Sequence, residues 1–482
     1  MASAGKPTMP PAYALAAMLA SGVLLYFATG LQPVAWLLCV APWPVLVATH
    51  RTAGWRGFAL CVGAWCIGGT GLASYLLTTL SVPAPIVLLA IAIPALQFAL
   101  VAALSRRLAA RGRFVAAALA LPAAWVALDY VQSLGSPHGT FGNLAYTQLD
   151  LLPVVQLASL TGVWGIDFLL MLLPSALAVL AAYALQRPAR LAIVIGTAAA
   201  CVFMLAFGAW RLSQPDGAST RVALIAADEP SFPHPVDDAA SQRMLSDVAL
   251  AIAHVAGQHP RIIVLPETIV ALEPATYPAF LARFQALAQA SGATIVVGAD
   301  VREHDAERNT ALVFDPGSAA VARYAKQHLL PPFEVRYQPG SALLTRQVSG
   351  TASGVAICKD MDFPALSRAY AQAGIHLMTV PAWDFVRDGR LHARMAVMRG
   401  IEGGFAVARS ARGGRMTLSD AYGRIIAERT SSARAVPLVA DVATGPVATR
   451  YTQWGDWFAW LALALAAGCM LLATIPGAQR SR

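Results

Sequence analysis

The stretch GVAICKDMDFP, residues 354–364, ends a strand-like run with Cys358, the only cysteine in the polar half of the chain. The other five cysteines lie in long apolar runs: Cys39, Cys61, Cys66, Cys201 and Cys469. A side chain at the carboxyl end of a strand in an α/β domain reaches the crevice where substrates bind. Glu267 and Lys326 end strand-like runs upstream. A base, a cation and a thiol are what acyl transfer through a thioester requires, so these three residues form the predicted catalytic triad.

The sequence around Cys358 alternates strand-like and helical patterns, which predicts an α/β layered domain. We expect strands at 221–227, 261–265, 293–299, 310–315, 320–325, 354–358, 376–380 and 405–409. We expect helices, from apolar residues at three- and four-residue spacing, at 238–257, 275–290, 364–373 and 391–400.

The chain as a whole is too apolar for an ordinary soluble protein: 57% of its residues are hydrophobic, 13% are charged, and the mean hydropathy is +0.57. Eight stretches are long enough to cross a hydrocarbon core of ~30 Å. They lie near 12–30, 33–49, 56–79, 82–104, 114–133, 162–186, 191–210 and 456–475. We therefore predict a membrane domain over 1–211 with seven helices, a catalytic domain over 212–454, and an eighth helix with a short cytoplasmic tail over 455–482.

The net charge of +9 does not indicate nucleic-acid binding, because the basic residues among the spans gather in alternate short loops. These residues are Arg51, Arg56, Arg106, Arg107, Arg111, Arg113, Arg187, Arg190, Arg480 and Arg482. Loops rich in Lys and Arg stay in the cytoplasm. Seven crossings then carry the chain outward before the catalytic domain, which predicts a multi-pass protein of the bacterial inner membrane with its catalytic domain in the periplasm.

Three motifs in one order resemble the carbon-nitrogen hydrolase, or nitrilase, superfamily. They are LPET around Glu267, YAKQHLLP around Lys326 and ICKDMDFP around Cys358. This resemblance implies an αββα sandwich over about 220–445. Seven spans before such a domain and one after it resemble the apolipoprotein N-acyltransferases, as do PAAWVALD at 122–129 and LASLTGVWG at 157–165.

The resemblance implies an acyltransferase with two lipid-anchored substrates. Cys358 would take a fatty acyl chain from a phospholipid as a thioester, and the amino-terminal amine of a diacylglyceryl-cysteine lipoprotein would then accept it. Glu334 matches a further glutamate of the family's site, and Lys359 and Asp360 follow the nucleophile as supporting residues. We expect no cofactor, no metal and no nucleic acid, and a monomer in the bilayer.

The sequence also departs from the family pattern. Residues 139–143 read GTFGN where the family has a Gly-Phe-Pro-Trp-like segment, and Lys359-Asp360 stands where Tyr-Glu is usual. Cys-Lys-Asp is closer to the Cys-x-Asp of amidases, so one alternative is a membrane-tethered amidase or nitrilase acting on a small amide. A second alternative is a non-catalytic sensor or assembly factor on a nitrilase scaffold.

Overall fold

A computed structural model describes residues 8–52, 54–303 and 306–476. The chain divides into two compact units. The helical unit comprises Met1–Gly135, Gly142–Leu212 and Trp454–Arg482, and the catalytic unit comprises Ser136–Phe141 and Ser213–Gln453. The short loop Ser136–Phe141 therefore leaves the helical unit and belongs to the catalytic one, although it lies far from the remainder of that unit in sequence.

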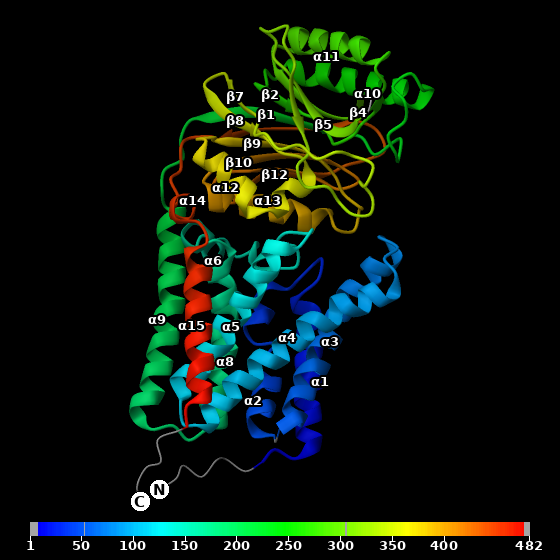
Figure 1. Cartoon of the computed structure of the whole chain (residues 1–482). Helices are drawn as coiled ribbons and strands as arrows, with labels where there is room; N and C mark the ends of the chain where they lie inside the picture. The colour runs from blue at the N-terminus through cyan, green and yellow to red at the C-terminus, as the bar shows by residue number, and fades with distance from the viewer. Residues whose placement is uncertain (1–7, 53, 304–305, 477–482) are drawn as a thin grey trace, which may run out of the picture. The chain divides into compact units, whose positions relative to one another are not determined.

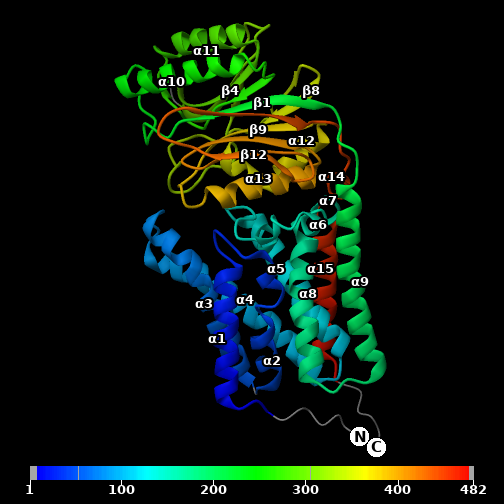
Figure 2. The same ribbon diagram turned by 180° about the vertical axis from the view of Figure 1, so that it is seen from behind.

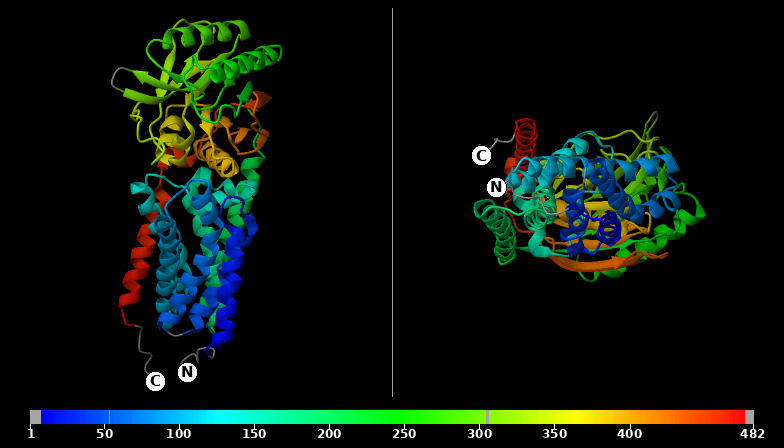
Figure 3. Two further views of the ribbon diagram at one scale, coloured as in Figure 1. Left: turned by 90° about the vertical axis from the view of Figure 1, so that its right-hand side faces the viewer. Right: turned by 90° about the horizontal axis from the view of Figure 1, so that it is seen from below.

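Seven helices among the described residues are long and apolar enough to cross a membrane. They are α1 (Pro11–Ala28), α3 (Gly54–Thr78), α4 (Ala84–Ala110), α5 (Phe114–Gly135), α8 (Val163–Ala182), α9 (Arg187–Leu212) and α15 (Trp457–Thr474) (Figure 1). Three short elements, η2 (Leu144–Gln148), α6 (Leu152–Val155) and α7 (Ala158–Thr161), link α5 to α8. Viewed along the bundle, α9 and α15 lie at its periphery (Figure 3).

The second predicted span, 33–49, does not form one long helix. It forms a 3-10 turn, η1 (Ala35–Cys39), and a nine-residue helix, α2 (Trp43–Arg51). Pro42 and Pro44 explain the break, because proline lacks an N–H and its ring clashes with the preceding turn. The segment still runs back along α1: Val34 N–H donates to Phe27 O at 2.8 Å, and Met9 N–H donates to Arg51 O at 3.1 Å.

Two β-sheets make the core of the catalytic unit, and each contains six strands paired in one continuous order. The first sheet has the order β13-β1-β2-β4-β5-β6, with β3 paired to β4, and the second has the order β12-β11-β10-β9-β8-β7. The first sheet contains β1 (Ser219–Ala226), β2 (Ile262–Val264), β3 (Ala271–Leu272), β4 (Thr294–Glu303), β5 (Ala306–Phe314), β6 (Ala322–Ala325) and β13 (Val436–Ala443). The second contains β7 (Thr345–Val348), β8 (Thr351–Val355), β9 (Leu377–Trp383), β10 (Ala406–Arg412), β11 (Arg415–Ser419) and β12 (Ile425–Thr430).

Helices cover the outer face of each sheet, which gives the αββα sandwich (Figures 1 and 2). They are α10 (Ala239–Ala256) and α11 (Tyr277–Ser291) on one side, and α12 (Pro364–Gln372) and α13 (Gly389–Gly403) on the other. Alternation along β1 explains the layers: Val222 and Leu224 belong to the core between the sheets, whereas Ala223 and Ile225 belong to the core under α10 and α11. Successive strand residues point to opposite faces, so both faces of this sheet are buried.

Candidate active site

The predicted nucleophile lies on a strained turn between β8 and a 3-10 helix, η3 (Cys358–Asp362). Cys358 has φ = +41°, a region that costs a residue with a side chain of order 1–3 kcal/mol and that persists where the surroundings enforce it. Its Sγ lies 3.5 Å from the carbonyl oxygen of Trp383, at the end of β9. The turn thus aims the thiol toward the carboxyl end of the neighbouring strand.

Lys326 joins two buried carboxylates. Its Nζ donates to Glu267 Oε1 at 2.8 Å and to both oxygens of Glu334, at 3.0 and 2.8 Å. Asn309 donates to the same pair, to Glu267 Oε1 at 2.6 Å and to Glu334 Oε1 at 2.7 Å. We call these four residues the carboxylate cluster. The structure therefore brings together three of the predicted site residues and adds Asn309, which the sequence analysis did not identify.

The order of strands in the first sheet explains why these side chains meet. Glu267 follows β2, Asn309 lies on β5 and Lys326 follows β6, with β4 between β2 and β5. Gly298 on β4 permits the close approach of Glu267, because a Cβ at Gly298 would lie 2.5 Å from the Glu267 Cα. Lys326 N–H donates to Asn309 O at 2.9 Å, which fixes the register between the last two strands.

Asp360 bonds to the nucleophile turn, residues 357–362, and to the loop that follows Lys326, and we call these bonds the Asp360 clamp. Its Oδ2 accepts from Ile357 N–H at 3.0 Å and from the Tyr324 hydroxyl at 2.7 Å. Its Oδ1 accepts from the backbone N–H groups of Gln327 and His328, at 3.2 and 2.9 Å. The carboxylate is fully buried. Asp360 therefore holds the residue before Cys358 and the residues after Lys326 in a fixed relation.

Lys359 points away from this clamp and toward the loop Ser136–Phe141. Its Nζ lies 3.2 Å from His138 Nδ1 and 3.5 Å from Asp362 Oδ2. In the same loop, Thr140 donates to the Asp362 carbonyl oxygen through its N–H at 3.1 Å and through its hydroxyl at 2.8 Å. Residues from between two predicted spans thus hold the far end of the nucleophile turn, which no periodicity in the sequence indicated.

A buried ion pair lies on the β9 and β10 side of the thiol. Arg409 donates to Asp384 Oδ2 at 2.8 Å and to Oδ1 at 2.5 Å, in a bidentate arrangement. Burial alone would lower the pKa of Arg409, but Asp384 outweighs it and raises that pKa. Arg409 therefore remains charged close to Cys358.

The surroundings of Cys358 favour its protonated form and make the nearby Glu267 a better base than an exposed carboxylate. Burial raises the pKa of Cys358, and Glu267 raises it further, against the opposing effects of Lys326 and Arg409. Burial also raises the pKa of Glu267 above its usual range, and Lys326 opposes that rise. Burial would lower the pKa of Lys326, but Glu267 and Glu334 outweigh it and raise it well above normal. Lys326 is therefore a permanent cation between the carboxylates.

Comparison with known proteins identifies the family. A carbon-nitrogen hydrolase model matches residues 221–443, and a model of the apolipoprotein N-acyltransferase N-terminal domain matches residues 21–176. The apolipoprotein N-acyltransferase of Geobacter metallireducens is 30% identical over 94% of both chains. The chain belongs to the apolipoprotein N-acyltransferase family. The relative from Azotobacter vinelandii is 27% identical over 85% of this chain and 84% of its own.

A solved structure of the nitrilase superfamily is similar to about half of the chain. An amidase of the nitrilase superfamily from Nesterenkonia AN1 is 22% identical over 50% of this chain and 95% of its own, with a TM-score of 0.42. The two family models show that this chain joins a carbon-nitrogen hydrolase domain to the apolipoprotein N-acyltransferase N-terminal domain, as the sequence predicted. This chain is an enzyme of that family.

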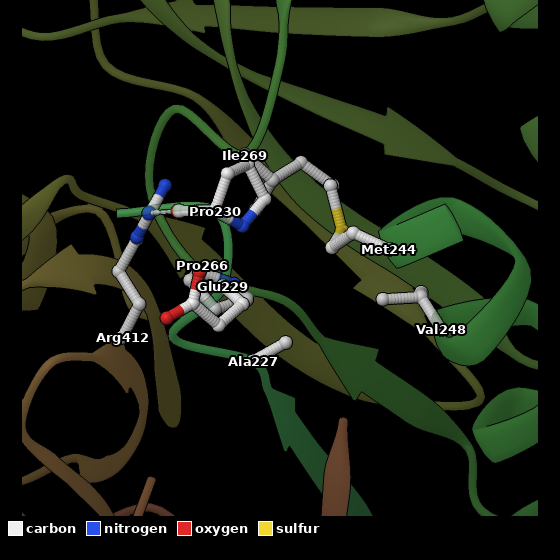
Figure 4. Close-up of a pocket in the computed structure, with 8 residues that line it drawn as sticks. All are labelled: Ala227, Glu229, Pro230, Met244, Val248, Pro266, Ile269 and Arg412. Atoms are coloured by element: carbon white, nitrogen blue, oxygen red, sulfur yellow. Dashed lines mark hydrogen bonds between the residues drawn. The ribbon is translucent and has the colours of Figure 1, made fainter. Parts of the chain in front are cut away.

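A small hollow is lined in part by Pro266, the residue before Glu267, and by no residue of the carboxylate cluster (Figure 4). Ala227, Met244, Val248 and Ile269 supply apolar walls, and Glu229, Pro230, Pro266 and Arg412 complete the lining. The Arg412 guanidinium stacks 4.7 Å from the centre of the Trp383 ring and donates to the Pro230 carbonyl oxygen. Within the described residues, no group of three or more His, Cys, Asp and Glu side chains is arranged to hold a metal ion.

Proposed function

We propose that this enzyme transfers a fatty acyl chain from a phospholipid to the amino-terminal amine of a diacylglyceryl-cysteine lipoprotein, through a thioester on Cys358. The observation that carries this proposal is the carboxylate cluster, whose Glu267 and Lys326 act electrostatically on the strained Cys358 thiol, in a chain of this family. The thiolate, not the thiol, is the nucleophile, so the site needs a base that removes the proton as the sulfur attacks.

In the first step Glu267 accepts the Cys358 proton while sulfur bonds to the ester carbonyl carbon. Lys326 and backbone N–H groups of the nucleophile turn stabilise the oxyanion; one such donor is typically worth about 3 kcal/mol. The carbon–oxygen bond then breaks, and the lysophospholipid leaves as an alcohol with the proton from Glu267. In the second step the lipoprotein amine attacks the thioester, Glu267 takes a proton from the amine, and the sulfur leaves and regains that proton.

Apolar side chains around the site support a lipid donor. Phe333 and Val335 flank Glu334, and both are exposed, Val335 to 78%. Phe333 packs on Phe385 with ring centres 5.1 Å apart, and Val386 beside it is 77% exposed. Exposed apolar patches mark surfaces that bind membranes, proteins or apolar ligands.

A third loop adds to this apolar rim. Phe232 is exposed and contacts Trp383 with ring centres 5.8 Å apart, and the Trp383 carbonyl oxygen is the acceptor for the Cys358 thiol. An acyl chain that reached Cys358 through water would cost about 0.8 kcal/mol for each exposed CH₂. Apolar walls next to the thiol avoid that cost, which favours a long-chain lipid over a small amide.

We also propose that the catalytic unit faces the periplasm. Arg51 donates to Ala181 O at 3.0 Å, and Arg107 donates to Ala473 O at 3.0 Å, so these loops gather at the end of the helical unit where α8 and α15 finish. Basic loops stay cytoplasmic. The catalytic unit is joined to the opposite ends of α5, α9 and α15. A membrane-impermeant maleimide should label a V386C variant in spheroplasts and leave an R113C variant unlabelled.

Mass spectrometry of the full-length protein, incubated with phospholipid, tests the acyl-transfer proposal. We expect a fatty acyl adduct on Cys358 that a diacylglyceryl-cysteine peptide removes as an amide, and no adduct on a Cys358→Ala variant. The proposal would be wrong if the wild-type protein released ammonia from small amides without lipid and formed no acyl adduct. An adduct that only water removes would limit the reaction to hydrolysis.

A further inference from the structure

Asn309 occupies the centre of the carboxylate cluster without carrying a charge. Its Nδ2 lies 2.6 Å from Glu267 Oε1 and 2.7 Å from Glu334 Oε1, and the residue is 1% exposed. An ionised carboxylate only accepts hydrogen bonds, so the amide nitrogen, and not the amide oxygen, must face both glutamates. Both amide hydrogens are consequently committed to the two carboxylates.

The amide oxygen shows that this orientation has a cost. Asn309 Oδ1 is buried and has no hydrogen-bond partner among the described residues. A buried acceptor without a partner is unfavourable. This unfavourable state of the oxygen is offset because both amide hydrogens bond to the carboxylates. The carboxylate cluster, and not the packing around the oxygen, therefore determines the orientation of the Asn309 side chain.

The two donors share one oxygen of Glu267 and leave the other available. Lys326 Nζ and Asn309 Nδ2 both donate to Oε1, at 2.8 and 2.6 Å, and no hydrogen bond among the described residues engages Oε2. The carboxyl group is therefore held at Oε1 by two donors, which restrains that oxygen and limits how the group can turn. Its second oxygen is the one able to take the Cys358 proton.

A neutral donor suits this position for an electrostatic reason. Glu267 and Glu334 carry two negative charges against the single charge of Lys326. A second cation would neutralise the base, whereas an apolar residue would leave Glu267 with fewer hydrogen bonds and favour its protonated form. An amide donor stabilises the carboxylate and adds no charge.

We propose that Asn309 is a positioning residue that aims Glu267 Oε2 at the Cys358 thiol and keeps Glu267 ionised. This inference rests on the proposed function for the roles of Glu267 and Cys358, but it concerns activation of the thiol and not the substrate. It predicts that the loss of Asn309 changes the pH dependence of Cys358 reactivity, because Glu267 then binds its proton more tightly.

The experiment measures alkylation of Cys358 by iodoacetamide in the full-length protein across a pH series. Peptide mass spectrometry distinguishes Cys358 from the other five cysteines. We expect Asn309→Ala to lower the rate roughly tenfold at neutral pH, from the loss of a hydrogen bond to a charged group, and to move the acid limb of the profile to higher pH. Asn309→Asp should lose more, since it keeps the size and adds a third carboxylate.

Two controls make the result decisive. Asn309→Ser retains a donor hydroxyl and should recover part of the rate. Thr310→Val alters the next residue of β5, whose hydroxyl donates to Arg308 O on its own strand and to no other group among the described residues. An Asn309→Ala profile that is lowered equally at every pH, with the same acid limb, would overturn the proposal and leave a structural role. Alkylation needs no lipid, so a failure of acyl transfer in the wild-type protein would not affect this outcome.

Discussion

The carboxylate cluster and the nucleophile turn adjoin the same thiol but are built differently. In the cluster, side chains bond to side chains: Lys326 and Asn309 each bridge Glu267 and Glu334. In the nucleophile turn, most bonds involve the backbone. Asp360 accepts from three backbone N–H groups, and the Asp362 carbonyl oxygen accepts twice from Thr140.

This difference separates two tasks. Side-chain bonds among charged groups set protonation states, because each partner changes the energy of the other's charged form. Backbone bonds set position, because they fix main-chain dihedrals and hold Cys358 at φ = +41°. Changes in the cluster should therefore alter the pH dependence of the reaction, whereas changes in the turn should alter its rate at every pH.

Removing the shared cation should have the largest effect. Lys326→Met leaves two buried carboxylates without compensation, and breaking a buried ion pair costs about 3–5 kcal/mol. We expect this loss in the free energy of unfolding, and a fall of at least ~10²-fold in the rate of thioester formation, as for the loss of an oxyanion donor. Denaturant unfolding and the acyl-adduct rate measure the two effects.

Arg323→Met is the matched control for Lys326→Met. Arg323 lies on the same strand, β6, and pairs with Glu303, but both side chains are nearly half exposed. An exposed pair is worth about 0–1 kcal/mol. If the two variants lost similar stability, the carboxylate cluster would not be the buried charge network described above.

Disrupting the clamp should have the next largest effect. Asp360→Ala removes five hydrogen bonds, among them those to the Tyr324 hydroxyl and His328 Nδ1. It leaves the backbone N–H groups of Gln327, His328 and Ile357 without their partner, at about 1–3 kcal/mol for each buried donor that stays unpaired. We expect slower thioester formation with an acid limb at the same pH as in the wild type. A shifted acid limb in Asp360→Ala would contradict the view that the nucleophile turn sets the position of Cys358 and the carboxylate cluster sets the protonation states.

At Gly139, the loop Ser136–Phe141 should not tolerate even the smallest side chain. Gly139 has φ = +54°, and a Cβ there would lie 2.5 Å from the Asp362 carbonyl oxygen. Overpacking of this kind typically costs about 1–3 kcal/mol. Gly139→Ala should slow thioester formation at every pH by displacing the turn, as measured by the acyl-adduct rate.

Gly142→Ala separates backbone strain from the clash. Gly142 also has a positive φ, +88°, but a Cβ there would meet no atom within 4 Å. We expect Gly142→Ala to lower the free energy of unfolding only by the cost of its positive φ, and to keep a nearly normal rate of thioester formation. Equal effects of the two substitutions would mean that the contact between Gly139 and the turn does not position Cys358.

The cluster and the turn also differ in how far the sequence predicts them. Glu267 and Lys326 were predicted because acidic, basic and thiol residues at the ends of strand-like runs indicate acyl transfer, whereas Glu334 was predicted only from the family resemblance. Asn309 was missed because a lone asparagine in a strand pattern is usually a turn or edge residue, and its value depends on two carboxylates 42 and 25 positions away. The signal available was its place near the start of a strand that pairs with the one ending at Lys326.

The fold was predicted where periodicity or length determines it. All eight expected strands and four expected helices of the catalytic unit are present within a few residues. Five strands were missed: β3, β7, β11, β12 and β13. The first two are only two and four residues long, and polar residues interrupt the alternation in the others. The prediction of one long helix for the second span was wrong, because its prolines break the helix. The role of the loop Ser136–Phe141 could not be predicted, because it depends on contacts between residues more than 200 positions apart, such as Thr140 and Asp362.

The smallest expected effect concerns His392, which packs beneath the turn. Its Nε2 lies 3.2 Å from Asp388 Oδ2, and its Nδ1 lies 3.9 Å from Asp362 Oδ1. Burial alone would lower the pKa of His392, but Asp388 and Asp362 outweigh it and raise that pKa. A raised pKa in the folded state means that the protonated imidazole stabilises the fold. This stabilisation is complete below the ordinary value of about 6.5 and is lost as the pH rises through the folded-state pKa.

His392→Gln should therefore lower Tm more at pH 5.5 than at pH 9, while His254→Gln, which alters an exposed histidine of α10, should lower it equally at both. The effect on the acyl-adduct rate should be small, because His392 contacts Asp362 and not the carboxylate cluster. A difference in Tm that grew toward alkaline pH would mean that His392 is buried in its neutral form. His392 would then support the nucleophile turn without a charged imidazole. The turn would differ even more from the carboxylate cluster, where charged groups set the protonation states.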